Sequence, residues 1–422
     1  MPRYASLRSP RNLHITKRMR LHGQGEPLNI LVVPPSDWVF HPFSSRLHYI
    51  FENLALRHNV NVLWFRLNAW NTPARATGAK LLPIAAPFTR DMSLNNVLTA
   101  PSVISSIRRI MNKESIDVVV TSNILPGLVA SVLAYNAGVP CLFDYHDHLP
   151  DSASLYYHHE PFKAMVRCTV SRIVSESLRT CSLVVCSSFS LAKIVAQSYA
   201  ISPSLIRVIP NGYDPEIFKP VVDRDALMKR LGLQELADYF LVTYAGSIEP
   251  RLDFDTVLAV IKDLHNDGHN VKLIILGKGV SGNFERDLRK RCARLSFVHF
   301  AGYLNNPVDV SHYIAISHAC VAPYKPILTN FGVTLKVLEY LAVARPTFVT
   351  PIPDIMEQLE GCVIAYRSRG DLYQKLKLLI TDRTAYKTIS ERGCQRVKDF
   401  TWTSTAYRYE KLLQEITACG GV

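Results

Sequence analysis

Apolar residues along the chain fall into short runs that alternate with longer amphipathic segments. The first run, residues 28–35, is rich in β-branched residues and stops at two prolines, which predicts a buried parallel strand. In residues 44–58 the apolar positions recur at roughly helical spacing, and a second strand-like run follows at 59–67. This alternation continues through the run at 182–188 and predicts a parallel sheet that helices cover on both faces.

A second alternating series begins after a turn at residues 210–214. Strand-like runs at 239–248 and 271–279 flank a helical segment at 253–268. Two such series predict two Rossmann-like parallel-sheet domains, with a ligand-binding cleft between the ends of their strands. We expect the following division of the chain: a tail at 1–26, an N-terminal domain at 27–213, a linker leading into the second domain at 214–237, a C-terminal domain at 238–398 and a final helix at 399–422.

Length and composition agree with this division. A chain of 422 residues exceeds one ordinary core, and 48% apolar and 20% charged residues are typical of a soluble globular protein. No apolar run reaches the roughly 18 residues that a membrane span needs, and the N-terminus has no apolar signal core. Nine scattered cysteines without a CxxC pair argue against a zinc knuckle and favour reduced thiols. We therefore expect a cytoplasmic protein.

The net charge of +13 favours anionic partners, such as nucleic acid, a membrane surface or phosphorylated ligands. Six of the basic residues lie in the first 26, which hold one acidic residue, Glu26. This tail is interpreted as a solvated, disordered segment, with a weak anchor to anionic lipid as the alternative. We expect no nucleic-acid partner, because no aromatic-rich basic strand or known nucleic-acid motif accompanies the charge.

Residues 332–350 place one Lys and one Glu in an otherwise apolar helical run. In a helix over about 333–344, Lys336 and Glu339 share one side. The free N–H groups and dipole at the start of such a helix attract phosphate, and Gly332 lets the backbone approach an anion closely. Lys336 adds positive charge, and Glu339 can accept hydrogen bonds from two ribose hydroxyls. The pattern fits a nucleoside diphosphate, and a surface ion pair is the alternative for the same spacing.

This segment also resembles the donor-nucleotide signature of the GT-B glycosyltransferases, especially family 4, the group 1 type. The signature is roughly K-x-x-E-[YA]-x-A-x-G-x-P, followed by a strand. The chain matches it at Lys336, Glu339, Tyr340, Ala342 and Pro346. It departs at Ala344, where the family usually has Gly, and at Phe331, where many family 4 enzymes carry an earlier Glu. The retaining stereochemistry of family 4 is therefore not carried over.

Other segments resemble the family in the expected order between residues 28 and about 415. In the loop after the strand at 239–245, the resemblance places Gly246 for close backbone approach and Arg251 against the diphosphate. The remaining resemblances are the glycine element at 273–279, the base-binding region at 297–324, the interdomain turn at 208–214 and the terminal helix at 400–413. The resemblance implies a GT-B fold with an N-terminal acceptor domain, a C-terminal nucleotide-sugar domain and a last helix that returns to the first.

The candidate acceptor side is the polar segment at residues 142–151, which follows a strand and should line the cleft. Asp147, or else His146, could take the proton of an acceptor hydroxyl if it lies within hydrogen-bond reach. A metal site and a polar loop that caps the next helix are the alternatives. Arg46 starts the first helix, which shapes the acceptor pocket in related enzymes, so it is a candidate for binding acceptor or phosphate, with a solvated Arg as the alternative.

The resemblance implies transfer of a sugar from a nucleoside diphosphate sugar to an acceptor hydroxyl, without a cofactor or an obligatory metal. Lys336, Arg251 and the amides near Gly332 and Gly246 would stabilise the leaving diphosphate. The basic tail and a basic helix at 159–180 suit a peripheral enzyme at the inner membrane face with a lipid-linked acceptor. A sugar-nucleotide epimerase, an inactive GT-B binding subunit and a nucleic-acid-binding protein are the alternatives. The oligomeric state is not predicted.

Overall fold

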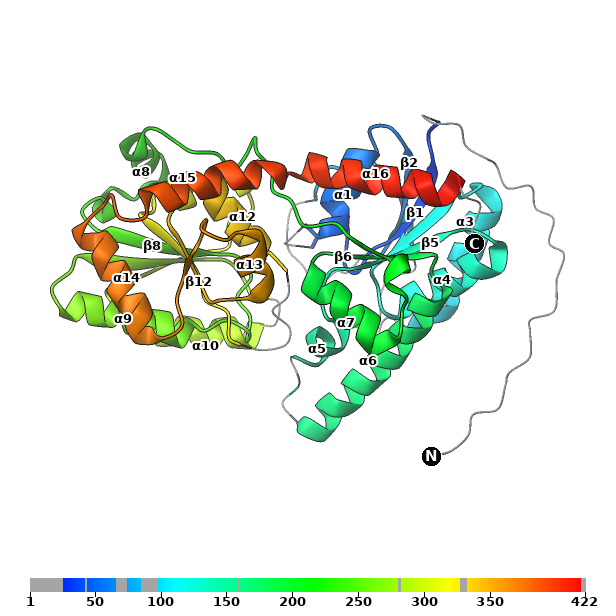
Figure 1. Cartoon of the computed structure of the whole chain (residues 1–422), viewed down its shortest axis with the longest axis horizontal. Coiled ribbons are helices and arrows are strands. Elements are labelled where there is room, and N and C mark those ends of the chain that lie inside the picture. The colour runs from blue at the N-terminus through cyan, green and yellow to red at the C-terminus, as the bar shows by residue number, and fades with distance from the viewer. Residues whose placement is uncertain are drawn as a thin grey trace.

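The computed structural model describes residues 26–41, 44–65, 74–84, 98–155, 157, 159–279, 282–326 and 332–418. The predicted tail before Glu26 and the departure at Phe331 lie outside these residues. The described part forms two parallel-sheet domains side by side, joined by two crossings of the chain (Figure 1). The predicted fold class is confirmed.

The first domain is a seven-stranded parallel sheet with the strand order β3-β2-β1-β4-β5-β6-β7. Its strands are β1 (Asn29–Val33), β2 (Asn59–Trp64), β3 (Lys80–Pro83), β4 (Val118–Thr121), β5 (Cys141–Tyr145), β6 (Leu183–Cys186) and β7 (Ile206–Val208). Its helices are α1 (Arg46–Leu54), α3 (Ala100–Lys113), α4 (Leu125–Ala137), α5 (Leu149–Ser154), α6 (Glu160–Thr180) and α7 (Phe189–Tyr199), with a 3-10 turn at Pro203–Leu205.

The second domain is a six-stranded parallel sheet with the strand order β10-β9-β8-β11-β12-β13. Its strands are β8 (Phe240–Ala245), β9 (Val271–Leu276), β10 (Val298–Gly302), β11 (Ala319–Ala322), β12 (Thr347–Val349) and β13 (Ile364–Ala365). Its helices are α8 (Arg224–Leu231), α9 (Phe254–Asn266), α10 (Gly282–Cys292), α11 (Pro307–Ile316), α12 (Leu335–Ala342), α13 (Pro353–Gln358), α14 (Arg369–Thr381) and α15 (Lys387–Arg396), with 3-10 turns at Gln234–Leu236 and Val397–Asp399.

The central strands of both sheets, among them β1 and β8, are almost entirely buried. In β1, Ile30 and Val32 join the hydrophobic cluster on one face, whereas Leu31 and Val33 join the cluster on the other. Side chains alternate across a strand, so both faces of β1 are covered. In both sheets the strand order reverses next to the first strand, at β1/β4 and at β8/β11, and ligands of such sheets bind beside this reversal.

The C-terminal helix α16 (Trp402–Ala418) returns to the first domain and lies along it in Figure 1. Trp402 stacks on Tyr49 of α1, with ring centroids 4.6 Å apart, and Tyr409 meets Phe51 edge to face. At the two crossings, the amide of Tyr213 donates to the carbonyl of Phe400, and the amide of Trp402 donates to the carbonyl of Tyr213. The two segments that connect the domains are therefore hydrogen-bonded to each other.

Candidate active site

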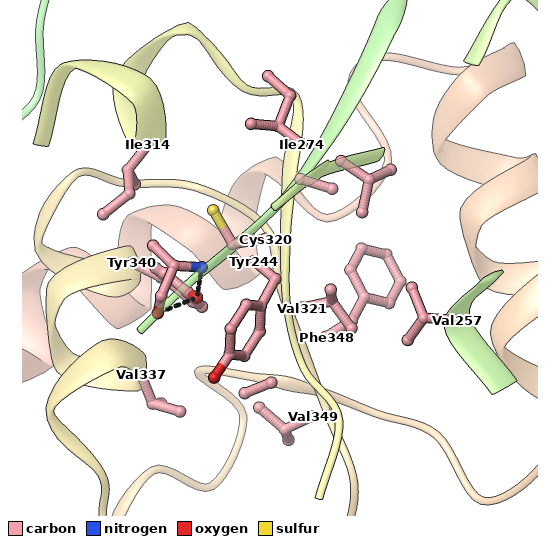
Figure 2. Close-up of a cluster of buried hydrophobic side chains, with 14 of the residues drawn as sticks. Tyr244, Val257, Ile274, Ile314, Cys320, Val321, Val337, Tyr340, Phe348 and Val349 are labelled. Carbon is pink, nitrogen blue, oxygen red and sulfur yellow. Dashed lines mark hydrogen bonds between the residues drawn. The ribbon is translucent and has the colours of Figure 1, made fainter. Parts of the chain in front are cut away.

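Helix α12, which carries the predicted Lys and Glu, is fixed to the end of the central strand β8. The Tyr340 hydroxyl accepts a hydrogen bond from the amide of Ala245 at 2.7 Å and donates to its carbonyl at 3.0 Å (Figure 2). Val337, Leu338 and Tyr340 are buried, whereas Lys336 and Glu339 are only half-buried. The apolar face of the helix thus holds it against the sheet and leaves Lys336 and Glu339 beside the strand reversal.

The side chain of Lys336 passes over the backbone at Gly246, the residue that follows β8. Its ammonium donates to the Tyr324 hydroxyl at 2.7 Å and lies 5.6 Å from the centroid of the Tyr244 ring. Gly246 has a φ of +145°, and a Cβ there would come within 2.6 Å of the Lys336 Cε. Glycine at this position is therefore what lets the lysine stem cross the backbone. The Lys336 ammonium therefore bonds to Tyr324, just after β11, and not to Glu339 of its own helix, which disfavours the surface ion pair.

Glu339 is an unusually weak acid for a carboxylic side chain. Burial raises its pKa to about 7, against the opposing effect of the Lys336 charge. Its charge also contributes, after burial, to raising the pKa of Tyr49 in the first domain to about 12. Glu339 therefore lies where the two domains face each other, and its carboxyl group changes protonation near neutral pH.

Arg251 does not stand alone at this site. Its Nε is 2.7 Å from the Oε2 of Glu249, a buried residue that the sequence analysis did not single out. Burial acts to raise the pKa of Glu249, but Arg251, a hydrogen bond from Ser247 and Lys336 hold it below its ordinary value. The Glu249 carboxylate therefore restrains Arg251 and also interacts electrostatically with Lys336. An acidic residue between Gly246 and Arg251 was the only signal in the sequence.

Gly332 differs from its prediction, because its amide is already bonded. It donates to the Oδ2 of Asp354 at 2.8 Å, and the Oδ1 of the same carboxylate accepts from the amide of Ser190 at 3.1 Å. Asp354 is fully buried, so its carboxylate requires such donors. This bridge joins the start of α7 in the first domain to the loop before α12. The Gly332 amide is therefore not free to bind a diphosphate, and the role expected of the amides near it stays a prediction.

The polar segment after β5 faces these groups from the first domain. The Oδ2 of Asp147 lies 4.0 Å from the Nη1 of Arg251. Its carboxylate also accepts from the amide of His148 at 2.9 Å and from the Ser152 hydroxyl at 2.6 Å. These two bonds tie Asp147 to the start of α5, but they are not the helix cap that is the alternative for this segment, because the N-cap residue is His148 and no side chain caps this helix. In the described part of the chain, no group of three or more His, Cys, Asp or Glu side chains is arranged to hold a metal ion.

His146 is held by a buried carboxylate. Its Nδ1 lies 3.1 Å from the Oδ1 of Asp144, and its side chain is 27% exposed while that of Asp144 is 1% exposed. Burial acts to raise the pKa of Asp144, but Arg46 and His146 hold it below its ordinary value. An ionised Asp144 accepts hydrogen bonds only, so it favours a proton on Nδ1 and leaves Nε2 as the basic nitrogen.

Arg46 has a different place from the one expected. Its side chain is 3% exposed, and its three nitrogens contact Asp144 at 3.1 Å, Asn211 at 3.0 Å and the Ile209 carbonyl at 2.5 Å. A guanidinium with these partners neither binds an acceptor nor lies in solvent, so both expectations are corrected. Removing one partner of a buried ion pair typically costs about 3–5 kcal/mol of stability, which gives Arg46 a structural role.

Comparisons with known proteins place this geometry in a family. The family model for Glycosyltransferase Family 4 matches residues 45–217, and that for Glycosyl transferases group 1 matches residues 239–382. The chain is 26% identical over 307 residues to a D-inositol 3-phosphate glycosyltransferase of Stackebrandtia nassauensis, covering 69% of this chain and 66% of the relative. It is 29% identical over 154 residues to an Escherichia coli UDP-Gal:alpha-D-GlcNAc-diphosphoundecaprenol alpha-1,3-galactosyltransferase, covering 35% of this chain and 36% of the relative.

Solved structures share the fold at lower identity. Sucrose-phosphate synthase from Thermosynechococcus elongatus superposes with a TM-score of 0.76 at 18% identity, over 93% of this chain and 100% of that one. Anabaena Alr3699/HepE in complex with UDP-glucose gives a TM-score of 0.69 at 18% identity, over 92% of this chain and 99% of that one. With both family models matched in order and both domains superposed, the chain belongs to the GT-B glycosyltransferases of the family 4, group 1 type.

Proposed function

We propose that this protein transfers a sugar from a nucleoside diphosphate sugar to an acceptor hydroxyl in glycan or glycolipid biosynthesis. The observation that carries the proposal is the meeting of two sets of side chains at the domain boundary. Lys336, Arg251 and Glu339 come from the second domain, beside the β8/β11 strand reversal. His146 and Asp147 come from the end of β5 in the first domain, and Asp147 approaches Arg251. One set suits a donor and the other an acceptor.

The second domain would bind the donor. Lys336 and Arg251 would both donate hydrogen bonds to the diphosphate, and the leaving diphosphate gains negative charge as the glycosidic bond breaks. Preorganised cations aimed at that charge are typically worth on the order of 10²–10³ in rate per group. Glu339 would accept hydrogen bonds from the ribose hydroxyls. With these cations in place, the reaction is proposed to need no metal ion and no cofactor.

The first domain would bind the acceptor and take its proton. The sequence favours Asp147 for this role, but the two oxygens of its carboxylate already accept from His148 and Ser152. His146 is now the better candidate, because Asp144 engages its Nδ1, which leaves Nε2 as the basic nitrogen, and its side chain is 27% exposed. Proton transfer by a positioned base typically contributes about 10²–10⁴ in rate. Asp147 would then orient the segment and restrain Arg251.

Titration calorimetry with UDP, GDP and dTDP tests the donor site. We expect one of the three to bind in the micromolar range and to identify the donor base. The matching nucleotide sugars are then incubated with the protein, and the products are followed by mass spectrometry with and without candidate acceptors. Conversion that requires an acceptor supports a transferase. Conversion of the nucleotide sugar alone would identify an epimerase, and weak binding without turnover would identify an inactive binding subunit.

A lipid-linked acceptor at a membrane surface is the finer proposal. None of the described helices is long and apolar enough to cross a bilayer. Helix α6, at the lower edge of the first domain in Figure 1, exposes Phe162 and Met165, which lie three positions apart and thus on one side of the helix. Three of its basic side chains pair with carboxylates: Lys163 with Glu160, Arg167 with Asp151 and Arg179 with Glu176. Apolar contact would therefore contribute more than charge. The galactosyltransferase relative is named for an acceptor on undecaprenol diphosphate.

Sedimentation with liposomes tests this surface. We expect the protein to sediment with vesicles that contain anionic phospholipid at low salt, and the double variant Phe162→Ser and Met165→Ser to stay in the supernatant. The matched control is Leu378→Ser, which changes an exposed apolar residue of the second domain. A wild-type protein that ignored such vesicles would end the proposal of a membrane-surface acceptor and leave the proposed transfer reaction untouched.

A further inference from the structure

A chain of hydrogen bonds links the acceptor-side histidine to the loop before the donor helix. It begins at His146 Nδ1, which lies 3.1 Å from Asp144, and continues to Arg46 at 3.1 Å. Arg46 donates to the side-chain oxygen of Asn211 at 3.0 Å, and the Asn211 amide nitrogen donates to the Val333 carbonyl at 3.1 Å. Val333 lies two residues before α12. The chain therefore runs from one domain to the other through the interdomain turn.

A further contact comes from the C-terminal helix. The Tyr409 hydroxyl donates to the same Asp144 oxygen that Arg46 contacts, and the Arg46 guanidinium lies 5.7 Å from the centroid of the Tyr409 ring. Asp144, Arg46 and Tyr409 are all buried. A buried polar chain whose members are all satisfied holds one geometry, because each alternative rotamer leaves a group without a partner.

We propose that Arg46 is a positioning residue, which orients His146 for proton transfer through Asp144 and ties it to the donor helix through Asn211. This role rests on the proposed function, because it needs His146 to act on an acceptor. A guanidinium only donates hydrogen bonds, so each of its two partners in this chain, Asp144 and Asn211, must turn an oxygen atom toward Arg46. Asp144 then presents its second oxygen to His146, and Asn211 presents its amide nitrogen to Val333. The donor nature of Arg46 thus fixes the orientation of the Asn211 amide, and its charge helps to keep Asp144 ionised, so that Asp144 can only accept from His146.

The same reasoning specifies what Asp144→Asn would do. The new amide would turn its oxygen toward Arg46 and Tyr409, because both are donors to that position, and would present its NH₂ group to His146. The Nδ1 of His146 would then have to accept, so its proton would move to Nε2. A general base needs a lone pair at the reacting nitrogen, and this tautomer would remove it.

The tautomer can be measured without any substrate. In ¹⁵N-histidine-labelled protein, at a pH above the titration of His146 observed in the same spectra, we expect the wild type to carry its proton on Nδ1 and Asp144→Asn to carry it on Nε2. His146→Gln identifies the signals. Because this measurement needs no activity, it tests the proposed tautomer even if the protein transfers no sugar. A wild-type His146 with its proton on Nε2, or an unchanged tautomer in Asp144→Asn, would overturn the proposal.

Kinetics then separates positioning from mere stability. Arg46→Lys keeps the charge next to Asp144 but cannot reach all three partners, and Asn211→Ala breaks the link to Val333. We expect kcat to fall at least about tenfold in both, and about 10²-fold or more in Asp144→Asn, with nucleotide affinity changed less than threefold. Arg57→Lys is the matched control, since Arg57, in the turn after α1, pairs with Glu410 of α16 outside this chain of hydrogen bonds. Variants that melted earlier but kept the wild-type kcat would show a structural role only.

Discussion

Replacing Lys336 with Met is expected to lower kcat by on the order of 10²–10³-fold while the protein stays folded. In the proposed donor site this ammonium would meet the charge on the leaving diphosphate; its stem crosses Gly246 and its Nζ is held 2.7 Å from the Tyr324 hydroxyl. Met keeps the apolar stem and its packing between the tyrosine rings, so the substitution removes the charge and little else. Initial rates with the nucleotide sugar identified by calorimetry measure the effect.

Two outcomes would count against this role of Lys336. Lys262→Met, at an exposed position of α9 in the same domain, should leave kcat unchanged, and a similar loss in both variants would point to a general effect of charge. A rise in KM with kcat preserved would mean that Lys336 binds donor and transition state equally. The account requires most of the loss to appear in kcat, because the diphosphate gains charge only as the bond breaks.

Replacing Glu339 with Gln is expected to weaken nucleotide binding by about tenfold to a hundredfold. A carboxylate accepts from two hydroxyls at once, whereas the amide offers one acceptor oxygen and an NH₂ group that cannot accept. Hydrogen bonds to charged groups are worth about 1.5–3 kcal/mol, and losing one of these corresponds to that range of affinity. Calorimetric titration of both forms with the same nucleoside diphosphate measures the change. Equal affinity would remove Glu339 from the site.

The pH dependence of binding provides a second test of Glu339. In the free protein burial raises its pKa to about 7, so about half of the molecules carry a neutral carboxyl group at that pH. Hydroxyl donors favour the charged form, so a bound ribose lowers this pKa. Affinity should therefore rise as the pH increases through about 7, and binding below pH 7 should release protons from Glu339. Glu339→Gln should lose this contribution while keeping any proton release from the nucleotide phosphate.

Local patterns in the sequence were sufficient to predict the elements that carry the site. The apolar spacing around Lys336 predicted a helix over about 333–344, and α12 spans Leu335–Ala342. Its amphipathic pattern depends on neighbours within the helix itself, which sequence spacing reveals. The alternating runs likewise predicted two parallel sheets, since a strand buried on both faces is continuously apolar. These features require no knowledge of distant contacts.

Contacts between distant residues were not predictable in the same way. Arg46 had the same appearance as a solvent-exposed or ligand-binding Arg, because its partners Asp144 and Asn211 lie 98 and 165 residues further along the chain. Tyr409 lies 265 residues from Asp144, and no local pattern connects them. Gly332 was correctly placed before the helix, yet the sequence did not reveal that buried Asp354 would take its amide. Such pairings arise from the packing of two domains and a returning helix.

The central claim is that a nucleoside diphosphate binds to the second domain at Lys336, Arg251 and Glu339. A crystal structure of the complex with the nucleotide selected by calorimetry tests it most directly. The account predicts phosphate oxygens within hydrogen-bond distance of both Lys336 and Arg251, and ribose hydroxyls bonded to the Glu339 carboxylate. It also predicts that the β-phosphate, which carries the sugar in the donor, faces His146 across the domain boundary. A nucleotide on the first domain, or phosphates in contact with neither cation, would contradict the account.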